Sequence, residues 1–273
     1  MYELMYRGFD EVDDGAEWDA GFLRLRRRLE TDLEARLRSR WSGPAAASPD
    51  LASDLFSFFE DANGPSVARF IQTSANAEQA REFLKVKSIY HLKESDPTTW
   101  VLPRLPVVAK AALAELQYDE YGAGDPNRLH HHLFARGLQG AGLTSSYGAY
   151  IDEAPVAVLE QNNTVSLFGL HRRLRGAAVG HLAAFEATSS IPSRRLAQGF
   201  ERVGLGQSIV DYYAEHVSAD AVHDQLAVRS ICGGLVAAEP EQRAEVFFGA
   251  FTCLDLERRF AEVWLAQWEE AAA

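Results

Sequence analysis

The chain has 273 residues, enough for one large domain or two small ones with a sizeable hydrophobic core. Hydrophobic residues make up 47% of the sequence and charged residues 24%, a composition that excludes a disordered chain. The formal net charge of -12 would repel a phosphate backbone or an anionic membrane surface, so we expect no nucleic-acid partner and no membrane partner.

No apolar run approaches the roughly 18 residues needed to span a bilayer, and the acidic N-terminus lacks the layout of a signal peptide. We therefore expect a cytoplasmic protein. Cys232 and Cys253 are too few for a disulfide framework or a thiolate metal cage. We expect both to be small buried residues.

Apolar residues recur at helical spacing in the first half of the chain. They predict an amphipathic helix over 17–41, a linker over 42–50, and a shorter helix that begins at Asp50. Further helices are predicted over 76–95, before the break at Asp96 and Pro97, and over 105–121, before the glycines at 122 and 124.

The same pattern continues in the second half of the chain. Helical segments are predicted over 128–140, 156–187, 193–217 and 220–236, with breaks at Pro155, at 189–192 and near 204–206. The last helix is expected from Pro240 to about Glu270. Because short alternating strands and internal repeats are absent from the sequence, it predicts a single all-α bundle.

Several catalytic signatures are missing from the sequence. It contains no complete dinucleotide loop, no phosphate-binding lysine loop, no HExxH helix and no GxSxG elbow. A ferritin-like di-iron bundle would require paired Glu-x-x-His motifs, and the chain has none.

One helical segment carries a cluster of metal-ligand residue types. At about 100° per residue, His216, Asp220 and His223 project from one face of a helix. Two imidazoles and a carboxylate form half of a metal site for a hard or borderline cation. A solvated helix face with the same residues is an equally common arrangement.

Other helices supply further candidates. Glu120 and His130 flank the glycine-rich interruption, which could let both side chains face one centre. Glu186 is a carboxylate on an apolar, alanine-rich face, where burial is costly unless the group is paired or metal-bound. We expect His131 and His132 to be surface residues.

These elements together resemble a known family. They are SIYHLKESDPTTW at 88–100, ELQYDEYG at 115–122, His130 with Leu133 and Phe134, AFE at 184–186, and His216-x3-Asp220-x2-His223. In order and in spacing they resemble the heme-oxygenase-like di-iron oxidases, also described as iron-containing redox enzymes. The resemblance runs from about residue 83 to residue 235.

The resemblance implies one heme-oxygenase-like helical domain over 1–273, with an N-terminal helix and linker over 1–47 and a metal-site core over 76–236. It implies two non-heme Fe(II) ions as cofactors, with O2 as co-substrate. The implied iron ligands, which are also the implied catalytic residues, are Glu120, His130, Glu186, His216, Asp220 and His223, with Glu94 as an auxiliary carboxylate. Asn127 stands where some N-oxygenating members have a further glutamate, so a seventh ligand there is not implied.

The ligand chemistry agrees with this implication. Three carboxylates and three imidazoles bring a formal charge of about -3 to two ferrous ions that carry about +4. The set is rich in oxygen and lacks thiolates, which suits iron or manganese more than zinc.

The expected function is that of an O2-dependent non-heme di-iron oxidase or oxygenase. Its substrate would be a small metabolite that bears an amine or a carboxylate, and the reaction N-oxygenation, desaturation or oxidative C-C cleavage. An electron donor and a homodimer are compatible with this expectation. Two alternatives stay open: a metal-independent enzyme of the same fold, such as a cofactorless oxidase or a thiaminase-like hydrolase, and a non-catalytic helical interaction protein.

Overall fold

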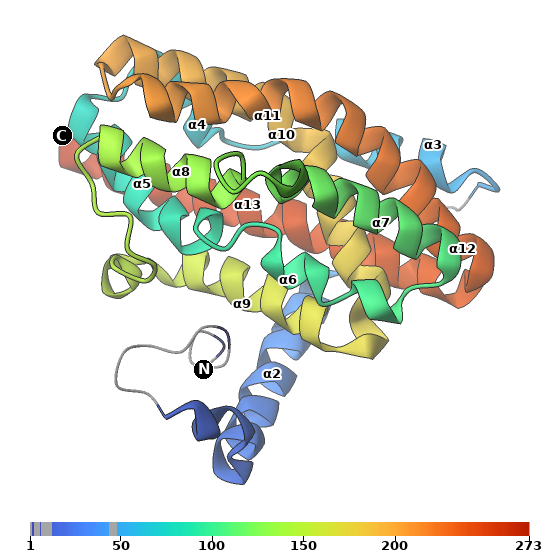
Figure 1. The fold of residues 1–273 in the computed structure, drawn as a ribbon. Helices are drawn as coiled ribbons and strands as arrows, with labels where there is room; N and C mark the ends of the chain where they lie inside the picture. Colours follow the sequence, from blue (N-terminus) through green and yellow to red (C-terminus); the bar gives the residue numbers. More distant parts are fainter. Residues whose placement is uncertain (1, 3–5, 7–12, 44–47, 273) are drawn as a thin grey trace. The chain divides into compact units, whose positions relative to one another are not determined.

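The computed structural model describes residues 2, 6, 13–43 and 48–272, apart from the side chains of 218–222 and 270–272. The described residues form helices, turns and loops with no β-strand among them, which confirms the all-α fold class (Figure 1). The chain divides into two compact units, residues 1–43 and 44–273. A single domain over 1–273 stays a prediction.

The first unit contains the predicted amphipathic helix. A short 3-10 turn, η1 (Asp14–Trp18), precedes α2 (Ala20–Arg40). The side chain of Asp19 caps α2 by accepting a hydrogen bond from the backbone N–H of Phe22 at 2.9 Å. The helix therefore begins three residues later than the periodicity predicts, where a capping carboxylate is available.

The second unit is a bundle of helices of very different lengths. In chain order they are α3 (Leu51–Glu60), α4 (Val67–Thr73), α5 (Ala77–His91), α6 (Asp96–Thr99), η2 (Leu102–Arg104), α7 (Val107–Glu120), η3 (Gly122–Gly124), α8 (His130–Gly140), η4 (Ile151–Glu153), α9 (Val156–Leu170), η5 (Arg172–Leu174), α10 (Arg175–Val203), α11 (Gln207–Gln225), η6 (Leu226–Cys232), α12 (Gly233–Ala238), η7 (Pro240–Gln242) and α13 (Arg243–Ala272).

The long helix α10 is the centre of this bundle and packs against α13, α11 and α4 (Figure 1). Glycines bring α10 and α13 into backbone contact. A Cβ added at Gly180 would lie 1.9 Å from the carbonyl oxygen of Val246, and one added at Gly249 would lie 1.9 Å from that of Ala177. The two helices can approach this closely only without side chains at these positions.

We expect Gly180→Ala to destabilise the protein by about 1–3 kcal/mol, because the new methyl group has to push α10 away from α13. Thermal unfolding measures the effect, at about 2–4 °C for each kcal/mol. Gly140→Ala is the matched control, since its Cβ would lie 3.6 Å from the Cβ of Ser208, an ordinary contact. Equal melting temperatures for the two variants would contradict this close-packing argument.

The predicted break at 189–192 is wrong, because α10 runs unbroken from Arg175 to Val203 with Pro192 inside it. Proline removes one backbone hydrogen bond and normally breaks or kinks a helix. Here α10, which packs along its length against α13, α11 and α4, continues through the proline. The predicted breaks at Pro155 and near Gly204 agree with the ends of the helices observed there.

Tertiary contacts also divide two predicted helices. The segment 156–187 is interrupted after Leu170, where Arg104 donates a hydrogen bond to the carbonyl oxygen of Gly169 at 2.6 Å. The segment 76–95 ends as a helix at His91, and residues 92–95 form turns before α6. Residues 226–232 adopt a π-helix, which the periodicity does not distinguish from an α-helix.

Both cysteines are free and buried, as predicted. Among the described residues, no helix combines the length and hydropathy that a membrane span requires.

Candidate metal centre

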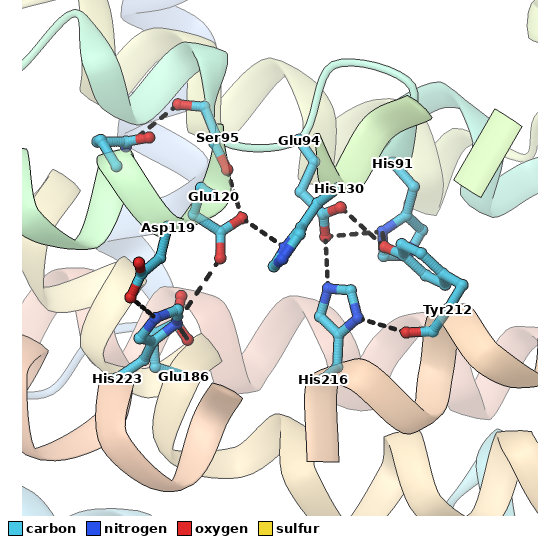
Figure 2. Close-up of polar contacts among 11 residues, drawn as sticks. His91, Glu94, Ser95, Asp119, Glu120, His130, Glu186, Tyr212, His216 and His223 are labelled. Atoms are coloured by element: carbon cyan, nitrogen blue, oxygen red, sulfur yellow. Dashed lines mark hydrogen bonds and ion pairs between the residues drawn. The ribbon is translucent and has the colours of Figure 1, made fainter. Parts of the chain in front are cut away.

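Six buried side chains from five elements meet inside the second unit (Figure 2). Glu94 lies in the turn after α5, Glu120 is the last residue of α7, and His130 is the first residue of α8. Glu186 lies on α10, and His216 and His223 lie two turns apart on α11. The centre therefore joins segments that are more than 100 residues apart in the chain.

These side chains form two groups of potential metal ligands, one made of Glu94, His130 and His216 and the other of Glu120, Glu186 and His223. Within each group, one ligand atom from every residue lies within 4.8 Å of the others.

Glu120 connects the two groups. Its Oε2 lies 3.1 Å from Nδ1 of His130, and its Oε1 lies 3.7 Å from Nδ1 of His223. One carboxylate thus faces both groups, the arrangement that a bridging ligand requires.

Two local backbone features position Glu120 and His130. Ser95 has φ of 63°, which is uncommon for a residue other than glycine, and its hydroxyl donates a hydrogen bond to Oε2 of Glu120 at 2.6 Å. Gly122 has φ of 69°, and a Cβ there would lie 2.6 Å from the backbone of Arg128 and Leu129. Only glycine lets the chain turn this tightly between Glu120 and His130.

The imidazoles are oriented by hydrogen bonds on their outer nitrogens. Nδ1 of His216 donates to the backbone carbonyl of Tyr212 at 2.7 Å, so Nε2 faces the centre, 3.7 Å from Glu94. Nε2 of His223 lies 3.4 Å from Asp119, so Nδ1 faces the centre, 3.5 Å from Glu186. An outer hydrogen bond of this kind sets the tautomer and the ring orientation of metal-binding histidines.

The nitrogens that face the centre fit a metal ion. Three nitrogens, Nδ1 of His130, Nε2 of His216 and Nδ1 of His223, are buried and have no well-aligned hydrogen-bond partner within the described part of the chain. Each lies beside a carboxylate oxygen, at 3.1 Å from Glu120, 3.7 Å from Glu94 and 3.5 Å from Glu186 respectively. Buried polar atoms normally have a partner, and a cation would supply one for all three nitrogens. A set of carboxylates and imidazoles without thiolates suits iron or manganese.

The titration behaviour of the histidines reflects the carboxylates around them. Burial by itself would lower the pKa of His216, but the hydrogen bond and charge of Glu94 outweigh it and raise the pKa to about 10. Burial is likewise outweighed at His223, where Glu186 raises the pKa to about 9. The pKa of His130 is also raised, against the effect of burial, by Glu120.

Glu94 is held by a second set of contacts on its outer side. Nδ1 of His91 lies 3.1 Å from Oε1 of Glu94, and the hydroxyl of Tyr212 donates to Oε2 at 2.8 Å. Burial would raise the pKa of Glu94, but the charge of His91 and hydrogen bonds from His216 and His91 hold it well below its usual range. The carboxylate is therefore kept ionised in a buried position.

The sequence also led to expectations for Asp220, Asn127, His131 and His132, which the structure treats differently. The side chain of Asp220 lies outside the described residues, although its backbone belongs to α11. Asn127 is exposed and hydrogen-bonds Asp125, so it does not face the centre. His132 is exposed, as expected, whereas His131 is half-buried, so the expectation of a surface position is wrong for His131.

Sequence reasoning assigned no role to four residues that hold the ligands in place. These are His91 and Tyr212 beside Glu94, Ser95 beside Glu120, and Asp119 beside His223. Helical spacing offers a signal for two of them, since His91 precedes Glu94 by three residues and Tyr212 precedes His216 by four. The other two could be found only from the tertiary structure.

We expect Asp119→Ala to weaken metal binding at the group that contains His223 by about 10-fold, because the imidazole loses the acceptor that orients it. Asp119→Asn keeps an acceptor oxygen and should retain most of the affinity. Anaerobic titration with ferrous iron measures both variants against Glu115→Ala, an exposed carboxylate on the same helix. A loss for Glu115→Ala as large as that for Asp119→Ala would contradict the proposed role of Asp119.

Comparisons with known proteins show the family and the fold of the chain. The family model described as iron-containing redox enzyme matches residues 81–258, so the chain belongs to the iron-containing redox enzyme family. No curated protein matches the chain.

Two crystal structures of a CADD-like protein of unknown function from Nostoc punctiforme share the fold. The one at 2.00 Å resolution has 19% sequence identity and a TM-score of 0.60, and the match covers 80% of this chain and 96% of that chain. The one at 1.35 Å resolution has 17% identity and a TM-score of 0.57, and the match covers 82% of this chain and 96% of that chain.

Proposed function

We propose that this member of the iron-containing redox enzyme family is an O2-dependent non-heme di-iron oxidase or oxygenase. The supporting observation is the pair of ligand groups that Glu120 connects, with three inward-facing imidazole nitrogens that lie beside carboxylates and have no well-aligned hydrogen-bond partner in the described part of the chain. The proposed ligands are Glu94, His130 and His216 for one ion and Glu120, Glu186 and His223 for the other, with Asp220 as a further ligand.

Two ferrous ions, when bound, supply electrons for the reduction of O2. Oxygenation or desaturation of a substrate provides two of the four electrons that full O2 reduction requires, so the remaining two must be returned by an external electron donor before the next turnover. The substrate is a small metabolite that bears an amine or a carboxylate. The reaction is N-oxygenation, desaturation or oxidative C-C cleavage.

The protein's own residues surround a small cavity at the proposed centre. A cavity of about 20 Å³ adjoins Glu94, Glu120, Glu186 and His216. That volume holds roughly one water molecule, so it also suits a diatomic molecule. The rest of its wall combines apolar side chains, namely those of Leu116, Leu182, Phe185 and the ring of Tyr90, with the polar residues Ser95, Thr98 and Gln117.

The direct test is anaerobic addition of ferrous iron followed by exposure to O2. Binding of two irons per chain and a transient visible absorbance after exposure would support the proposal. A metal-independent enzyme of the same fold, or a non-catalytic helical protein, would bind no stoichiometric iron and show no absorbance change.

Product analysis by mass spectrometry separates the three reactions. N-oxygenation adds an oxygen atom to the substrate, desaturation removes two hydrogens, and C-C cleavage yields two fragments.

A further inference from the structure

A cavity in the second unit lies next to the metal centre. It measures about 320 Å³ and is bordered by α5, α10 and α13 and by residues 59–68. Small-molecule sites begin at about 300 Å³, so this cavity has the size of a ligand site. At about 30 Å³ for each water molecule, it has room for roughly ten waters or for an amino acid with a large side chain.

The inner end of this cavity faces the proposed iron ligands. His91, whose Nδ1 contacts Glu94, lines the cavity together with Phe185, the neighbour of Glu186. Phe185 also lines the small cavity among the ligands, and its ring packs against that of Tyr90 with centroids 5.6 Å apart. One aromatic side chain therefore separates the large cavity from the metal centre.

An ion pair lines the same cavity. Nζ of Lys87 lies 3.3 Å from Oε1 of Glu257, and Gln161 donates to the same oxygen at 3.0 Å. The ammonium also lies over the ring of Phe260, 4.6 Å from its centroid. Lys87 precedes His91 by one helical turn on α5, which places the pair close to Glu94.

The rest of the wall is mainly apolar. Most of it is formed by aromatic and aliphatic side chains, among them Phe59, Val67, Phe83, Leu196, Leu254 and Phe260. Polar side chains also line it, namely Asn63, Ser66, Thr188, Ser189, Ser193 and Arg258, and Arg258 is itself paired with Asp255 and Glu262. A ligand that fits this cavity has an apolar body with a charged or polar head at the inner end.

The ion pair between Lys87 and Glu257 favours one kind of charged head group on the ligand. A ligand with only a carboxylate would compete with Glu257 for Lys87 and leave the glutamate without its counter-ion. A ligand with only an amine would compete with Lys87 for Glu257 and leave the lysine without its counter-ion. The cost of such an unpaired charge is largest for Lys87, whose side chain is only 16% exposed, and smaller for Glu257, whose side chain is 45% exposed. A zwitterion compensates both charges at once, with its carboxylate on Lys87 and its ammonium on Glu257.

We propose that this cavity is the substrate site and that the substrate is an α-amino acid with an apolar side chain, held by Lys87 and Glu257. This inference rests on the proposed di-iron function, and it narrows the substrate from an amine or a carboxylate to a molecule that carries both groups. The apolar side chain extends away from the ion pair along Phe83 and Phe260.

The experiment measures binding to the iron-loaded protein without O2, by isothermal titration calorimetry. The probes are L-valine, L-leucine, L-phenylalanine and L-tryptophan. Two further probes each carry one half of the phenylalanine head group: 2-phenylethylamine has only the ammonium, and 3-phenylpropionate has only the carboxylate. We expect at least one amino acid to bind, and for the phenylalanine series we expect the zwitterion to bind at least about 10-fold more tightly than either half.

Two substitutions test the ion pair while they preserve side-chain volume. Lys87→Met and Glu257→Gln should each weaken amino-acid binding by about 10-fold or more and remove the preference for the zwitterion. Lys85→Met is the matched control, because Lys85 lies on the same helix but pairs with Glu153 at 3.2 Å and does not line the cavity. It should bind the amino acid like the parent.

The proposal is overturned if no amino acid binds, if either half binds as tightly as the zwitterion, or if Lys87→Met and Glu257→Gln bind like Lys85→Met. Iron stoichiometry, measured on the same samples, separates this failure from failure of the proposed function. Two irons without amino-acid binding would refute the substrate class alone. Amino-acid binding that depends on Lys87 and Glu257 in a protein without stoichiometric iron would refute the di-iron function.

Discussion

Replacement of Glu120 by alanine should abolish tight binding of both irons, with a loss of about 100-fold or more at each. Among the carboxylates whose side chains the structure describes, Glu120 is placed toward both ligand groups, 3.1 Å from Nδ1 of His130 and 3.7 Å from Nδ1 of His223. Its removal takes a negative charge and a bridging ligand from both ions together. Anaerobic ferrous titration with metal analysis measures the stoichiometry.

Glu94→Ala and Glu186→Ala provide the comparison, because each of these carboxylates belongs to one group. Either substitution should reduce the stoichiometry from two irons to about one. Glu115→Ala, on the exposed side of α7, should bind two irons. If Glu120→Ala keeps one tight iron, Glu120 is not shared between the groups and the bridging assignment is wrong.

The metal-free protein should lose stability as the pH rises from about 6.5 to 10. The folded-state pKa values of His216 and His223, about 10 and about 9, lie above the value of 6.5 for an ordinary histidine. Below pH 6.5 both the folded and the unfolded chain hold these protons, so the stabilisation is complete. Between pH 6.5 and 9 to 10 only the folded chain holds them, and each imidazole lowers the free energy of unfolding by on the order of 1 kcal/mol per pH unit.

Thermal unfolding of the metal-free protein between pH 7 and pH 9 measures this slope. The double variant His216→Asn, His223→Asn should show a flatter dependence, because its side chains do not titrate. Equal slopes for the parent and the double variant would refute the assignment of raised pKa values to these two histidines.

The affinity for iron should change with pH in the opposite direction to the stability of the metal-free protein. A metal ion binds the neutral imidazole, so binding at pH 7 has to displace the protons that Glu94, Glu120 and Glu186 stabilise on the three histidines. We expect roughly one proton to be released for each histidine that binds iron, measured by calorimetry in two buffers of different ionisation enthalpy. Affinity for iron should therefore rise with pH while the stability of the metal-free protein falls.

Local sequence patterns determined the fold class and most of the helices. Apolar residues at helical spacing predict an all-α chain, and the caps and breaks at Asp50, Pro155 and Gly204 mark helix ends that the structure also shows. The pattern also places His216 and His223 two turns apart on one helix. All of these features depend on interactions within a few residues, which a single segment of sequence contains.

Packing between segments that are distant in the sequence determines the features that local patterns do not predict. Close contact with α13 and other neighbours keeps α10 continuous through Pro192, against the local preference of proline. The separation of the ligands into two groups, the place of Glu120 between them and the contact of Asp119 with His223 join residues from different helices. No periodicity within one segment contains this information, because it depends on which helices pack together. Local patterns are therefore enough to predict most helices and the residue types that they carry, whereas the set of residues that share one centre depends on how the helices pack.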